Sequence, residues 1–270
     1  MGDREALLRE AERNLRAQLR EHFAPNPNQR PSLFGRLFTV PQTLDHAVHS
    51  LRDVLMALRE QNDFCQSWRI VRSPEDHEAV TGLDPITQTE EYIQFLRHHD
   101  RQSDDWHIME ILAFSDLIYP DDPRSYSAQF SYTGGLSRRL FDEVRFQTRA
   151  PQVTQDLTFD QWISMIETIT TWRKTRYLTV GTSSYAHHYA VFELRAWRGW
   201  IGWFPEQIAP SSLPDFAVVM PVGPGMVVAT QRERLRIDRE EDLERAAQVE
   251  MALADLGVLP LNRDLSDAQQ

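Results

Sequence analysis

The sequence contains a single cysteine, Cys65, in 270 residues. One thiol cannot form an internal disulfide and supplies no cluster of thiolates for zinc, which is typical of a reducing compartment. No apolar run approaches the roughly 20 residues that a membrane-spanning helix needs. The first 21 residues carry charges throughout and lack the continuous apolar centre of a secretory signal. These absences predict a soluble, cytoplasmic protein that does not contact a membrane.

Motifs that mark catalytic or cofactor sites are also scarce. Gly134 and Gly135 are adjacent, but no Lys-Ser/Thr pair follows them as in a phosphate-binding loop. Ser183 and Ser184 precede His187, but their neighbours do not form the Gly-x-Ser-x-Gly turn of acyl-transfer enzymes. We therefore predict no catalytic residue, no cofactor and no enzymatic activity.

Metal-type ligands are densest between His98 and His107. Adjacent histidines point to opposite faces of a strand and diverge by about 100° on a helix, so His98 and His99 make a poor pair for one metal. A solvated acidic loop explains this composition, and we predict no metal site. A metal-dependent enzyme is the alternative, and stoichiometric metal in the purified protein would support it.

Positive charge is in short supply, since 29 basic residues face 40 acidic ones and the net charge is −11. This balance argues against binding the phosphate backbone of nucleic acids. The segment from residue 73 to 122 holds thirteen acids and two bases, which accounts for the whole net charge. The tryptophans at 197, 200 and 203 could stack on bases, but burial in a sheet suits an acidic chain better.

Hydrophobic periodicity predicts an α+β fold with an antiparallel or mixed sheet packed with helices, preceded by an N-terminal amphipathic helix. Apolar residues at helical spacing predict helices over 3–21 and 44–58, one after the Thr158 and Gln161 capping box, and one that starts near Asp238 and Glu241 and stops at Gly257. Predicted strands cover 109–119, 125–132, 143–148, 177–180, 189–194, 200–204 and 226–230. Residues 1–40 are assigned to the first helix and a Pro-rich linker from Ala24 to Ser32, residues 41–260 to a single α+β domain, and residues 261–270 to a flexible tail.

Four segments, at 51–68, 197–203, 212–214 and 250–260, resemble the bacterial immunity protein 52 family in order and spacing. The likeness spans roughly residues 43–260. It implies a protein that binds and neutralises a cognate secreted toxin, an effector of type VI or contact-dependent secretion whose toxic domain is a restriction-endonuclease-like DNase. The family carries no catalytic residues over to this chain.

Acidic residues interleaved with aromatic ones suggest where such a toxin binds. A nuclease must present cations near its active site, so an acidic surface with aromatic anchors would occlude it without any direct contact between this chain and nucleic acid. The predicted contact residues are Glu90, Glu91, Tyr92, Asp104, Asp105, Trp106, Asp121 and Asp122. An adaptor or chaperone that loads an effector onto a secretion machine is the alternative function. The sequence leaves the oligomeric state open.

Overall fold

The computed structural model describes residues 24–40, 42–61, 65–71, 83–99, 109–115, 128–134, 142–148, 156–192 and 195–260. Within these ranges nine strands form one antiparallel sheet in the order β2-β3-β4-β5-β1-β6-β7-β9-β8. The strands are β1 (Ser32–Leu37), β2 (Trp68–Val71), β3 (Met109–Ser115), β4 (Ala128–Gly134), β5 (Asp142–Thr148), β6 (Thr175–Gly181), β7 (Gly199–Phe204), β8 (Val218–Val222) and β9 (Gly225–Ala229). Of the two predicted sheet types, the antiparallel one is therefore observed.

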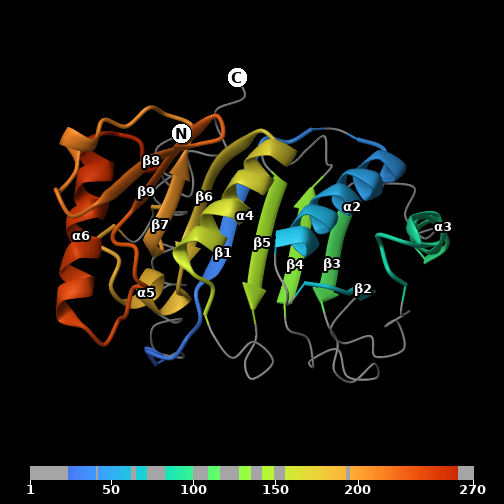
Figure 1. The fold of residues 1–270 in the computed structure, drawn as a ribbon, viewed down its shortest axis with the longest axis horizontal. Helices are drawn as coiled ribbons and strands as arrows, with labels where there is room; N and C mark the ends of the chain where they lie inside the picture. Colours follow the sequence, from blue (N-terminus) through green and yellow to red (C-terminus); the bar gives the residue numbers. More distant parts are fainter. Residues whose placement is uncertain are drawn as a thin grey trace, which may run out of the picture.

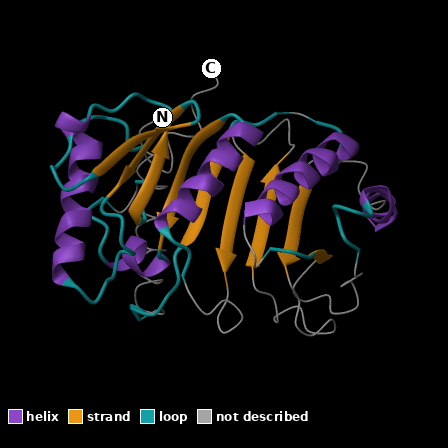
Figure 2. Ribbon diagram, viewed as in Figure 1, coloured by secondary structure: helices purple, strands orange, loops and turns teal. Residues whose placement is uncertain are grey.

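Two helices, α2 (Leu44–Gln61) and α4 (Phe159–Trp172), lie side by side across one face of the sheet (Figures 1 and 2). The helix α3 (Thr89–His99) lies beside α2 at one end of the molecule, and α6 (Glu240–Asp255) lies against β7 at the other. A short helix, α5 (Ser183–His188), follows β6. This arrangement confirms the α+β fold. No helix among the described residues is both long and apolar enough to cross a membrane.

The strand β1 is at the centre of the sheet, because it pairs with β5 on one side and β6 on the other. The sequence-based division placed these residues in a linker that ends at residue 40. The pairing instead makes Ser32–Leu37 part of the main body, which therefore begins no later than residue 32.

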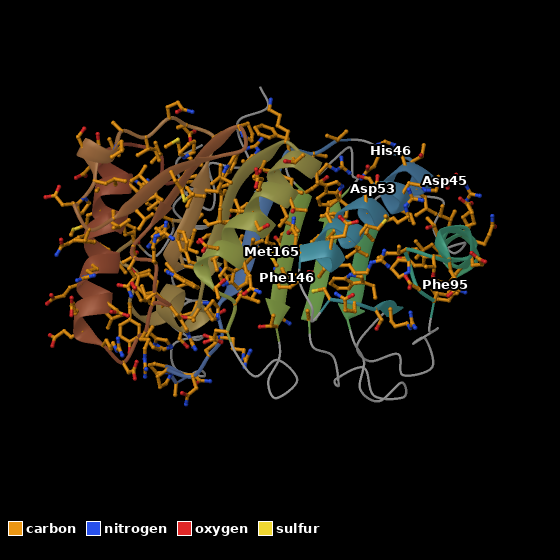
Figure 3. The ribbon with its side chains drawn as sticks, viewed as in Figure 1. Asp45, His46, Asp53, Phe95, Phe146 and Met165 are labelled. Carbon is orange, nitrogen blue, oxygen red and sulfur yellow. The ribbon has the colours of Figure 1, made fainter. Side chains whose placement is uncertain are left out.

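Apolar side chains fill the space between the sheet and its two covering helices. Leu33 and Leu37 of β1 are fully buried on this side, and Phe146 of β5 contacts the Trp162 ring of α4 edge-on at 6.1 Å. Figure 3 shows Phe146 and Met165 where α4 crosses β5. We call this the helix face of the sheet.

The segment before β1 is fastened to the body. The Asn26 backbone N–H donates to the Ser184 hydroxyl at 3.1 Å, and the Ser184 N–H donates to the Gln29 side chain at 2.8 Å. The Arg234 guanidinium donates to the Gln29 carbonyl at 2.7 Å. The proposed linker from Ala24 to Ser32 is thus held at α5, while the predicted helix over 3–21 and the tail over 261–270 lie outside the described residues.

Two local predictions are confirmed and two are wrong. The capping box of Thr158 and Gln161 starts α4, and Gly257, with φ +71°, ends α6 in a Schellman motif. The N-cap of α6 is Arg239, which makes no side-chain cap bond, so the predicted caps at Asp238 and Glu241 are wrong.

The predicted strand over 189–194 is also wrong in its described part. The Glu250 carboxylate accepts hydrogen bonds from the backbone N–H groups of Val191 and Phe192, at 3.1 and 2.8 Å, and these bonds fix an irregular turn. Burial raises the pKa of Glu250, although these two N–H donors and Tyr185 oppose that rise.

Candidate protein-binding surfaces

The first candidate surface is acidic and lies at the α3 end of the molecule. Glu90 and Glu91 occupy the first turn of α3 and are exposed. Negative side chains are favourable there because the free N–H groups of a helix start carry partial positive charge. The charges that suggested a toxin contact also suit the local helix.

Tyr92 does not share that exposure. It is 1% exposed and packs with Ile93 into the main core beside α2. Tyr92 therefore supports α3 from inside and is not a surface anchor, which corrects the sequence-based expectation. The helical turn separates it from Glu91 by about 100°, enough to place one on the surface and the other in the core.

The helix α2 extends this acidic surface. Asp45, His49 and Asp53 are spaced four residues apart on one side of α2, and the His49 imidazole lies 3.3 Å from the Glu90 carboxylate. Figure 3 places Asp45 and Asp53 along α2 at the α3 end of the molecule. We define Asp45, Asp53, Glu90 and Glu91 as the α3 acidic surface.

Guanidinium groups moderate its charge. Arg97 binds both oxygens of Asp45 at 2.6 and 2.7 Å, and Arg52 binds Asp53 at 3.2 Å. Four carboxylates and two guanidiniums leave two negative charges in excess within this group. The other predicted contacts, Asp104, Asp105, Trp106, Asp121 and Asp122, lie outside the described residues.

The second candidate surface is the side of the central strands opposite the helix face, which we call the polar face. Side chains on a strand alternate between the two sides of a sheet. Register therefore places the following rows on the polar face, from β4 through β5 and β1 to β6: Gln129, Gln147, Ser32 and Gly181; Ser131, Arg145, Phe34 and Thr179; and Thr133, Glu143, Arg36 and Tyr177.

Three arginines surround Phe34 on the polar face. Their guanidinium carbons lie 5.9 Å (Arg36), 5.4 Å (Arg145) and 5.1 Å (Arg198) from the centre of the ring, within the range of cation–π attraction. Arg198 comes from the loop before β7 and also donates to the Ser32 hydroxyl at 3.2 Å. We call Phe34 with these three residues the Phe34 arginine cluster.

Electrostatics show that these cations affect one another. Burial lowers the pKa of Arg198 to about 10, and the positive charge of Arg145 lowers it further. Burial also raises the pKa of Tyr177 to about 12, against the opposing effect of Arg36 and Arg198. The cluster is therefore a concentrated positive charge partly removed from water.

Sequence reasoning did not find this cluster. Its arginines lie at positions 36, 145 and 198, and each is isolated in the sequence. The available signal was the alternation in Ser32–Leu37, where apolar positions 33 and 37 alternate with 32, 34 and 36. That pattern indicates a strand but does not show which distant strands bring further arginines to it.

The residues weighed for chemistry have structural contacts. Ser184 is buried, and its hydroxyl accepts the bond from Asn26 described above. Asp142 is fully buried and accepts the Tyr132 hydroxyl at 2.7 Å, and burial followed by this carboxylate raises the Tyr132 pKa. Within the part of the chain that the structure describes, no group of three or more His, Cys, Asp or Glu could hold a metal ion.

Comparisons with known proteins give one informative likeness. No protein-family model matches the chain, and no curated protein does. Among solved structures, the chain is similar to the Pseudomonas aeruginosa T6SS (type VI secretion system) protein PA0821, with a TM-score of 0.53 and 10% identity. The similarity covers 85% of this chain and 73% of that one. At this identity the two proteins share a fold.

Proposed function

We propose that this protein is an immunity protein that binds and neutralises a secreted toxin of a type VI secretion system. The observation that carries the proposal is the fold shared over most of the chain with a T6SS protein. The sequence resemblance to the immunity protein 52 family points in the same direction and supplies the finer assignment. A binding role also suits two oppositely charged surfaces on a well-packed sheet.

In this proposal the toxin is a nuclease and the α3 acidic surface meets its cationic substrate-binding surface. Glu90 and Glu91 are rigidly placed because Tyr92 and Ile93 anchor α3 in the core. A preorganised surface loses little side-chain freedom on binding, and complementary charge accelerates association. Inhibition would follow from steric and electrostatic occlusion of the site that grips phosphates.

Cell growth tests the function itself. Cells that express the toxin domain encoded next to this protein should survive only when this protein is co-expressed. An effector-loading adaptor, the alternative, would bind the effector but leave cells expressing the toxin domain unprotected. Survival without this protein, or death with it, would contradict the immunity role.

The double variant Glu90→Lys with Glu91→Lys tests the surface. Charge reversal should lower the association rate with the toxin domain by roughly tenfold at low salt, since steering depends on long-range charge. The rate constant is measured by stopped-flow fluorescence. The difference from the unmodified protein should shrink as salt screens it.

Glu240→Lys with Glu241→Lys is the matched control, because this pair is also exposed in the first turn of a helix, α6, at the other end of the molecule. It changes net charge by the same amount. Equal slowing by both double variants would show that only total charge matters, and the α3 acidic surface would then be the wrong contact.

A further inference from the structure

The Phe34 arginine cluster brings like charges together from three separate segments. Arg36 belongs to β1, Arg145 to β5 and Arg198 to the loop before β7. Like charges repel, and half-burial strengthens that repulsion because water screens it less. The fold nevertheless holds all three against one phenyl ring, in a chain whose net charge is −11.

Local carboxylates offset only part of this charge. Glu143 is the one acidic residue on the polar face of β4, β5, β1 and β6 within the described residues, and its carboxylate lies 2.7 Å from Nε of Arg145. Three guanidiniums and one carboxylate leave two positive charges in excess in this group. Lys174 and Arg176 add two more cations beside the neighbouring Phe38 ring, at 4.7 and 4.6 Å from its centre.

The surroundings of the cluster have the composition of a protein interface. The Arg145 side chain is 63% exposed, and Phe34 is half-buried beside it. Uncharged hydrogen-bonding groups flank them on β4 and β5, where the Gln147 amide donates to the Gln129 side chain at 2.7 Å. Arginine and aromatic residues dominate binding energy in such interfaces, and a polar rim surrounds them.

We propose that the Phe34 arginine cluster is a second docking site, which binds a carboxylate-bearing segment of a protein partner. A guanidinium stacked on a ring still donates from its edge, and its planar fork matches a carboxylate with two parallel hydrogen bonds. The proposal goes beyond the immunity function, since it concerns a different face and does not require the toxin to be a nuclease.

A protein segment fits this surface better than a nucleic acid. Both carry acceptor oxygens that guanidiniums bind, but a nucleic acid strand extends its charge well past a single patch. The remainder of this chain is strongly acidic and repels such a polyanion, whereas a short acidic segment meets mainly the cations. Charge complementarity therefore favours a compact set of aspartate or glutamate side chains.

The test titrates the full chain into fluorescein-labelled hexaglutamate, at low salt, with fluorescence anisotropy as the readout. A single-stranded thymidine hexanucleotide with the same label is the competing probe. We expect saturable binding of the peptide, weaker binding of the oligonucleotide, and roughly tenfold weaker peptide binding by Arg145→Gln, because one charge-assisted contact is lost.

Arg145→Gln is the main variant because its side chain is exposed, so folding should be unaffected; Arg198→Gln, at a half-buried position, is the second. Arg232→Gln is the matched control, since Arg232 also combines exposure, an acidic neighbour at 3.5 Å (Asp160) and an aromatic ring at 5.0 Å (Phe159). Peptide affinity of the control should stay within about twofold of the unmodified protein.

Four results would overturn the proposal. They are the lack of saturable peptide binding, an equal loss of affinity in Arg232→Gln, tighter binding of the oligonucleotide than of the peptide, and displacement of the peptide by a second copy of this chain that Glu90→Lys abolishes. The last result would make the occupant the α3 acidic surface of another copy. Survival of toxin-expressing cells with Arg145→Gln is a separate readout, which reports on the immunity function alone.

Discussion

The two faces of the central strands differ sharply although their residues alternate along the same chain. On β1, Leu33 and Leu37 are 1% and 0% exposed beneath the helices, while Phe34 and Arg36 lie between them in sequence and face the other side. The helix face is apolar and closely packed. The polar face holds hydrogen-bonding groups and a concentration of guanidiniums. One strand thus supplies the core with one set of positions and a surface with the other.

The difference separates stability from recognition. Burial of apolar side chains on the helix face is favourable in proportion to the area removed from water. The Phe34 arginine cluster, by contrast, costs stability because its charges repel and are partly desolvated, as the lowered pKa of Arg198 shows. Surfaces that give up stability in this way are typical of functional sites.

Substitutions at two adjacent positions of β1 should show this separation most strongly. Leu33→Ala removes a buried side chain and should lower the free energy of unfolding by about 3 kcal/mol, whereas Phe34→Leu on the polar face should change it by less than about 1 kcal/mol. Denaturant unfolding followed by circular dichroism measures both. Similar losses for the two variants would show that the polar face is as much a core as the helix face, and the comparison would fail.

A glycine on the helix face gives the next largest effect. A Cβ atom at Gly35 would lie 2.1 Å from Cδ2 of Leu178 and 3.2 Å from Cγ1 of Val144, both from neighbouring strands. Gly35→Ala should therefore cost about 2 kcal/mol, even though alanine restricts the unfolded chain more than glycine does. Adding Leu178→Ala makes room for the new methyl group, so the double variant should lose less than the sum of the single losses. Additive losses would show that the two strands are not tightly packed at this point.

The sequence allowed much of the fold to be predicted, because amphipathic periodicity and local capping act over short distances. The stripe in α2 and the capping box of α4 are of this kind. The irregular turn after α5 could not be predicted, since its β-rich sequence is overridden by Glu250, about 60 residues further along the chain. The central place of β1 was missed for the same reason, because its partners β5 and β6 are distant in sequence.

The candidate sites follow the same rule. The acidic segment is contiguous, so its charge was visible in the sequence, and Glu90 and Glu91 are indeed exposed. The burial of Tyr92 depends on how α3 packs beside α2, which composition does not encode. The Phe34 arginine cluster depends on strand register, and a shift by one residue would turn Phe34 and Arg36 towards the helices.

The smallest effect concerns the titration of Tyr177, which faces Arg36 across β1 and β6. Burial raises its pKa to about 12, above the ordinary value of 10.0, so the folded state holds the proton more tightly than the unfolded state. The contribution of Tyr177 to stability is therefore complete below pH 10, falls as the pH rises towards 12 and is lost above it. Because the charge of Arg198 lowers this pKa, Arg198→Gln should raise it further, and Lys at this position should leave it nearly unchanged. Nuclear magnetic resonance of ¹³C-labelled tyrosine follows the titration, with Tyr177→Phe to assign the signal. A pKa that is the same with and without Arg198 would show that the cations of the polar face do not act as one cluster, and the contrast between the two faces would then rest on packing alone.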